Sequence, residues 1–132
     1  MMSGPRDQAV RNPAVAGMFY PAGSEQCQAA VRELFQSARA AGAAKQEKPL
    51  PALVGLGAVV PHAGWVCSGA IAAEAIAALA AQRPQVDLVV VLGAIHTAMP
   101  VERGVLDSYA RWAVPGGEST VRGVIREELA AK

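Results

Sequence analysis

The chain contains two histidines, and each follows an apolar run that ends in a short loop. His62 follows the run 54–60, and His96 follows the run 86–92 by way of Gly93. Neutral imidazole is the commonest metal-ligating side chain in proteins. Ligands of open α/β sheets bind outside the carboxyl ends of the strands, so histidines after two adjacent parallel strands would meet at one edge. The pattern therefore predicts the beginning of a metal site.

Two histidines leave such a site incomplete, because zinc and non-haem iron usually take at least three protein ligands. Cys67 lies five residues after His62, at the expected start of a helix, where the helix N-terminus favours the thiolate. Its simpler interpretation is a half-buried residue that caps the helix. Glu74 and Asp107 are carboxylates farther along the chain, and nothing in their spacing marks either as the third metal ligand. Both histidines also keep a simpler interpretation, in which they only satisfy hydrogen bonds of their loops.

Other chemistry finds less support in the sequence. Ser68 lacks the Gly-x-Ser-x-Gly frame of hydrolase nucleophiles, and before a helix it is expected to serve as an N-cap. The Gly93 loop lacks the spaced glycines of a dinucleotide-binding fingerprint. Aromatic and small residues in the expected loops suit a pocket. The residues predicted to line it are Tyr20, Gly64, Trp65 and Thr97.

Alternating helices and strands are expected around these residues. Apolar residues at helical spacing predict an amphipathic helix over 24–41 with its first residue, Ser24, as N-cap. Short β-branched runs at 54–60 and 86–92 predict strands that are covered on both faces. A helix over 68–81 joins them into a βαβ unit, which is almost always parallel and right-handed.

The rest of the chain completes the prediction of an α/β fold with a mostly parallel sheet. A third strand is expected over 101–106 and a C-terminal helix over 118–132. Residues 1–12 are expected to form a flexible arm, and residues 13–132 a single α/β domain. A chain of 132 residues is long enough for one core of ordinary size.

Composition excludes several classes of partner. Lys and Arg total 12 against 11 Asp and Glu, and the resulting net charge of +1 gives no reason to expect nucleic acid or an anionic membrane. Pro84 and nearby charges interrupt the apolar sequence short of the roughly 20 residues that a membrane span needs. The polar stretch 1–11 lacks the core of a secretory signal, and the two distant cysteines suit a reducing compartment. A cytoplasmic location is therefore expected.

Three sequence elements in a fixed order resemble the Memo-like family, also called AmmeMemoRadiSam system protein B. They are AVAGMFYPA at 14–22, VPHAGW at 60–65 and VLGAIH at 91–96. The resemblance implies a three-layer α/β sandwich whose mostly parallel central sheet is flanked by helices, related to the class III extradiol dioxygenases. It also implies that His62 and His96 are the first two ligands of a metal ion, iron or copper rather than zinc.

The chain departs from the family pattern at several positions. Members often have Pro-Ser where Ala94-Ile95 stand, and a basic or histidine residue where Thr97 stands. Some carry a histidine in place of Val15 and a tyrosine in place of Cys67. Members are also considerably longer, and their third ligand comes from the half that has no counterpart here. The chain therefore resembles the N-terminal half of the family fold, a half-length version of it.

Two hypotheses of function follow. The first is a Memo-like metal-binding protein with a two-histidine site at the carboxyl ends of adjacent strands, completed by Cys67 or by another chain. If it is an enzyme, this hypothesis makes it a dioxygenase-like, non-haem iron or copper oxidoreductase. The second is a non-catalytic binding or scaffold module that uses the same pocket for a peptide or partner protein. The expected partner is a second copy of the chain, or a different chain that supplies the missing half.

Overall fold

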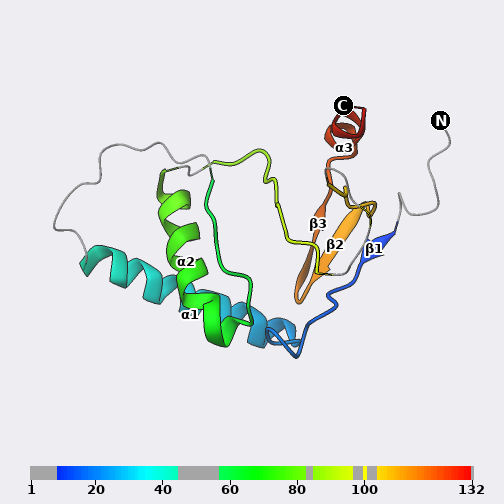
Figure 1. The fold of residues 1–132 in the computed structure, drawn as a ribbon. Helices are drawn as coiled ribbons and strands as arrows, with labels where there is room; N and C mark the ends of the chain where they lie inside the picture. Colours follow the sequence, from blue (N-terminus) through cyan, green and yellow to red (C-terminus); the bar gives the residue numbers. More distant parts are fainter. Residues whose placement is uncertain (1–8, 45–56, 83–84, 97–99, 101–103, 132) are drawn as a thin grey trace. The chain divides into compact units, whose positions relative to one another are not determined.

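The structure is a computed structural model that describes residues 9–44, 57–82, 85–96, 100 and 104–131. These residues hold three helices and three short strands (Figure 1). They belong to two compact units. Residues 15–88 form the helical unit, and residues 1–14 together with 89–132 form the sheet unit.

The helical unit is built from α1 (Ser24–Ala44) and α2 (Trp65–Gln82), which pack against each other (Figure 1). Small residues allow the two helices to approach closely. A Cβ atom added at Gly69 would lie 3.1 Å from Cδ1 of Leu34, tighter than nine in ten real contacts of Cβ atoms. The buried side chains on the two helices are those of Cys27, Ala38, Ser68 and Ala73.

The predicted first helix is confirmed, and its ends differ from the prediction. α1 continues through Gly42 to Ala44. The carbonyl of Gly23 accepts the N–H of Cys27 at 2.8 Å, so Gly23 is the N-cap and Ser24 is the first helical residue. The N-cap prediction for Ser24 was therefore wrong by one position. A glycine at the N-cap is one of the favoured choices, because it adopts the required non-helical backbone easily.

The second helix begins at Trp65, three residues before its predicted start. The carbonyl of Gly64 accepts hydrogen bonds from the N–H groups of Cys67 at 2.8 Å and of Ser68 at 3.1 Å. Ser68 thus lies within the first turn and is not its N-cap. Its buried hydroxyl instead donates to the carbonyl of Ala63 at 2.9 Å. The helix therefore begins in the segment that was expected to be a loop.

The apolar run 86–92 does not form a strand. Residues 85–96 contain neither helix nor strand, and their side chains are exposed. A strand needs a neighbour for its backbone N–H and C=O groups, and no strand in the described part of the chain pairs with this run. Residues 57–60 also lack strand structure, whereas 54–56 lie outside the described residues. The described residues therefore do not contain the predicted βαβ unit.

The sheet unit contains a three-stranded sheet in the order β1-β2-β3 (Figure 1). β1 (Val10–Arg11) runs parallel to β2 (Arg111–Val114), which is antiparallel to β3 (Gly117–Thr120). The helix α3 (Gly123–Ala130) follows β3. The α/β class is thus confirmed, with a small mixed sheet in the residues that the structure describes.

The hairpin β2–β3 replaces the beginning of the predicted helix 118–132. Val114 pairs with Gly117, so Pro115 and Gly116 form a two-residue turn between the strands. Proline presets the first central position of such a turn, and the second requires a positive φ, which Gly116 has at 96°. The Pro-Gly pair was the sequence signal for this hairpin. At the predicted strand 101–106, residues 104–106 have no strand structure and 101–103 lie outside the described residues.

Among the helices that the structure describes, α2 is long and apolar enough to cross a membrane by length and composition alone. Core helices of soluble proteins pass the same test. Residues 1–8 of the expected N-terminal arm lie outside the described residues, and Val10–Arg11 belong to the sheet.

Replacing Gly116 should destabilise the hairpin. In the variant Gly116→Ala the new Cβ must tolerate a positive φ, which costs roughly 1–2 kcal/mol for a non-glycine residue. Gly117→Ala is the matched control, because Gly117 has ordinary backbone and open space around it. Urea unfolding followed by circular dichroism measures both free energies. Equal stabilities of the two variants would contradict the assigned turn.

Candidate functional site

The helical unit contains an apolar cavity of about 360 Å³ that is open to solvent on one side. Four segments line it: the loop 15–20, α1, the loop 60–63 and α2. His62 lies on this lining together with the aromatic side chains of Tyr20 and Trp65. The cavity is therefore a site where one imidazole borders a mainly apolar space.

The loop 15–20 is folded by its own backbone. The N–H of Gly17 donates to the carbonyl of Tyr20 at 2.7 Å, and the N–H groups of Met18 and Phe19 both donate to the carbonyl of Val15. Gly17 has a φ of 82°, a conformation that glycine adopts without a steric cost. This compact turn presents Val15, Phe19 and Tyr20 to the cavity.

Two contacts join this loop to the start of α2. The N–H of Trp65 donates to the carbonyl of Phe19 at 2.8 Å. The rings of Tyr20 and Trp65 lie with their centroids 5.4 Å apart, at an interplanar angle of 32°. Tilted aromatic pairs at this spacing are favourable beyond the area they bury. The backbone of Gly64 passes close to the loop, since a Cβ there would lie 3.5 Å from the carbonyl oxygen of Phe19.

The loop directly after His62 is held by a short-range hydrogen bond. His62 lies in an exposed stretch between Pro61 and the start of α2. The buried Ser68 hydroxyl donates to the carbonyl of Ala63, directly after His62. The buried serine thus orders the histidine loop, and its proton is engaged with a carbonyl group. This is a structural role for Ser68 in place of the N-cap that the sequence predicts.

His96 belongs to the sheet unit, whereas His62 belongs to the helical unit. Both side chains are exposed. Their convergence was predicted from two parallel strands that the described residues do not form, and it stays a prediction. Thr97, one of the predicted pocket residues, lies outside the described residues.

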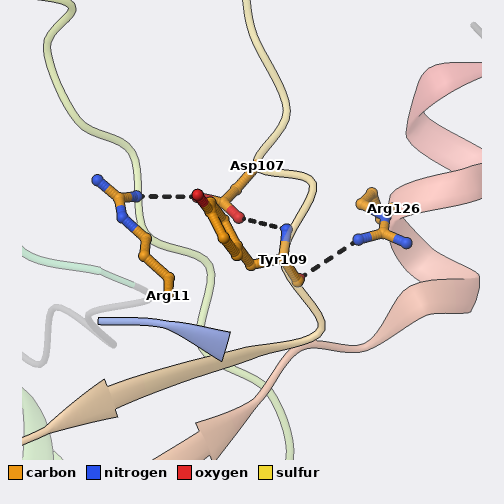
Figure 2. A network of polar contacts seen from close by, with 4 residues as sticks. All are labelled: Arg11, Asp107, Tyr109 and Arg126. Carbon is orange, nitrogen blue, oxygen red and sulfur yellow. Dashed lines mark hydrogen bonds and ion pairs between the residues drawn. The ribbon is translucent and has the colours of Figure 1, made fainter. Parts of the chain in front are cut away.

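Cys67 is exposed in the first turn of α2, whereas Cys27 is buried on α1. Among the residues that the structure describes, no three or more His, Cys, Asp or Glu side chains lie close enough together to hold a metal ion. Asp107, a distant candidate in the sequence, forms an ion pair with Arg11 at 2.8 Å and accepts the N–H of Tyr109 (Figure 2). Its carboxylate is thus engaged within the sheet unit.

The part of the cavity that α1 contributes was not predicted. Val31, Leu34 and Phe35 lie on the apolar stripe of α1, and this stripe lines the cavity. The helical spacing revealed which residues turn inward, and it did not reveal what they face.

A sequence model of the Memo-like protein family matches residues 11–132. The chain belongs to the Memo-like family. It is 35% identical over 121 residues to a MEMO1 family protein of Ignicoccus hospitalis, covering 91% of this chain and 42% of that protein. A MEMO1 family protein of Pyrobaculum arsenaticum is 34% identical over 119 residues, covering 89% of this chain and 41% of that protein.

A third Memo-like relative, from Methanosarcina mazei, is 35% identical over 112 residues, which cover 85% of this chain and 36% of the relative. The chain thus spans about two fifths of the length of the curated relatives that it matches. No solved structure matches it. The family match includes the loops of both His62 and His96.

Removing the Ser68 hydroxyl should loosen the histidine loop. Ser68→Ala leaves the carbonyl of Ala63 without its buried donor, at an expected cost of about 1 kcal/mol in the free energy of unfolding. Ser24→Ala is the matched control, because Ser24 is exposed and only accepts a long 3.4 Å contact from Gln28. Urea denaturation compares the two. A loss no larger than that of the control would remove this role for Ser68.

The two cysteines should differ in reactivity. Cys67 is exposed and should react with Ellman's reagent in the native protein, whereas Cys27 should react only after denaturation. Cys67→Ser should abolish the fast phase, and Cys27→Ser should preserve it. A fast phase that survives Cys67→Ser would show that the accessible thiol is assigned to the wrong residue.

Proposed function

We propose that this Memo-like protein binds a redox-active metal ion, iron or copper rather than zinc, through His62 and His96. The observation that carries the proposal is the position of His62, which lines an apolar cavity beside the Tyr20–Trp65 pair and is itself exposed. An imidazole at the border of an apolar cavity can bind a metal ion next to a space for a small molecule. His96 ends the second apolar run in the same way that His62 follows the first.

The residues present have the right ligand chemistry for such a metal, and they are too few for a complete ligand set. Imidazole suits iron, copper and zinc alike. Two imidazoles do not complete the usual set of three protein ligands, and the described residues form no group of three. The third ligand in this proposal is the exposed Cys67, or a side chain of a second polypeptide.

A second polypeptide is supported by the apolar surface of both units. The hydrophobic side chains buried in the described residues are those of Cys27, Ala38 and Ala73. Val66 on α2 is fully exposed, and Leu92 in the run 86–92 is 92% exposed. Large apolar surfaces of this kind mark interaction sites. We therefore propose that a second copy, or a companion chain carrying the remainder of the Memo-like fold, covers them.

If the protein is an enzyme, an iron or copper ion at this site would support oxidoreductase activity. The cavity would hold the organic substrate, since its walls are mainly aromatic and aliphatic. Because the ligand set among the described residues is incomplete, no chemical step is assigned to these residues alone. A non-catalytic module that uses the same cavity to bind a peptide or protein is the alternative that the experiment below distinguishes.

Metal content measured together with mass tests the proposal. The purified chain is incubated anaerobically with Fe(II) or Cu(I), freed of excess metal, and analysed by elemental mass spectrometry and light scattering. We expect bound metal in the wild type and its loss in both His62→Ala and His96→Ala. Asp87→Asn, which alters an exposed carboxylate in the run before His96, should retain the metal.

Three outcomes are informative. Full metal retention in either histidine variant, with an intact circular dichroism spectrum, would overturn the assigned ligands. Loss of metal in Cys67→Ser would identify the third ligand, whereas retention in an oligomer would place that ligand on a second chain. No metal in the wild type under any loading condition would refute metal binding by this chain and favour the binding-module alternative.

A further inference from the structure

The first strand of the sheet is too short to hold itself in place. β1 consists of Val10 and Arg11, which pair in register with Arg111 and Trp112 of β2. One further backbone hydrogen bond, from the N–H of Ala110 to a carbonyl just before β1, extends the pairing. Isolated strand pairs are marginal even at greater length. Side chains must therefore supply much of the attachment of β1.

Arg11 supplies two such contacts at once. Its Nη1 atom lies 2.8 Å from Oδ2 of Asp107, and its guanidinium carbon lies 4.2 Å from the centre of the Trp112 ring. The second oxygen of Asp107 accepts the N–H of Tyr109 at 2.8 Å, which fixes the carboxylate in position (Figure 2). Arginine suits this place because its planar group can stack on a ring and donate to a carboxylate together.

The segment that carries Asp107 and Tyr109 is also held by a residue of α3. Figure 2 shows Arg126 of α3 donating to the carbonyl of Tyr109, at 3.4 Å. The segment that presents Asp107 to Arg11 is therefore connected both to β1 and to α3. β1 in turn is followed after three residues by Val15, the first residue of the loop 15–20 that lines the cavity.

We propose that Arg11, Asp107 and Trp112 form a salt-sensitive latch that holds the N-terminal strand on β2 and releases it when the ion pair is screened. Both partners of the pair are partly exposed, with 45% of the Arg11 side chain and 28% of the Asp107 side chain accessible. Dissolved ions screen pairs at such positions readily. Release frees the edge of β2, to which β1 is paired. The latch is independent of metal binding.

A second ion pair on the same sheet provides the control. Arg111 and Glu118 lie 2.8 Å apart, and both are about half exposed. They join β2 to β3 and include no residue of β1. Glu118→Gln thus removes a comparable exposed pair and leaves the latch intact. Asp107→Asn removes the charge that faces Arg11, while the amide oxygen can still accept the N–H of Tyr109.

Limited trypsin cleavage after Arg11 reads the state of the latch, because the protease cuts only where the strand has left the sheet. The rate of appearance of the fragment that begins at Asn12 is measured by mass spectrometry and normalised to cleavage of the urea-unfolded chain. We expect Asp107→Asn to raise the rate about two- to fivefold, as for an exposed ion pair. Salt at 0.5 M should raise the wild-type rate similarly.

The controls decide the result. Glu118→Gln should cleave at the wild-type rate, and added salt should change Asp107→Asn little. Trp112→Leu should also accelerate cleavage, since it removes the ring beneath the guanidinium. Equal rates for Asp107→Asn and the wild type, or a wild-type rate that salt does not change, would overturn the latch. Acceleration by Glu118→Gln equal to that by Asp107→Asn would also overturn it, because the effect would then be general.

Discussion

The close approach of α2 to α1 is the constraint on which the helical unit depends. A Cβ atom on residue 69 would lie 3.1 Å from Cδ1 of Leu34 and 3.3 Å from Cβ of Trp65, so glycine permits this approach without a shift of its neighbours. At this separation the first turn of α2 reaches the loop 15–20, so that Trp65 donates to Phe19 and stacks beside Tyr20. The position of the histidine loop follows from that packing, because it is the segment that leads into α2.

The cavity follows from the same packing. The two helices bury small side chains where they touch, and their larger apolar residues remain beside the contact. Aromatic residues of the loop 15–20 and aliphatic residues of α1 then surround a space of about 360 Å³. Its lining is mainly apolar and includes a histidine, a tyrosine and a tryptophan, a composition typical of small-molecule sites. This combination is what makes the helical unit a candidate binding site.

Backbone pairing explains the other main feature, the exposed apolar run 86–92. A run of valines and leucines has strong strand propensity, yet propensity cannot form a strand without a partner for the backbone. The sheet unit satisfies its own strands through a hairpin and the two residues of β1. The curated relatives are more than twice as long as the segment that they share with this chain.

The sequence by itself determined the family, the α/β class, the two long helices and the histidines as the residues worth testing. These properties depend on local patterns: helical spacing, motif order and residue type. The sequence also predicted Tyr20 and Trp65 as pocket residues, and both line the cavity. Only the tertiary structure decided that the Ser68 hydroxyl donates to the histidine loop, that Asp107 pairs with Arg11, and that 86–92 forms no strand in the described part of the chain. Asp107 and Arg11 lie 96 positions apart, and the other two outcomes depend on which segment lies beside each residue, about which propensity carries no information.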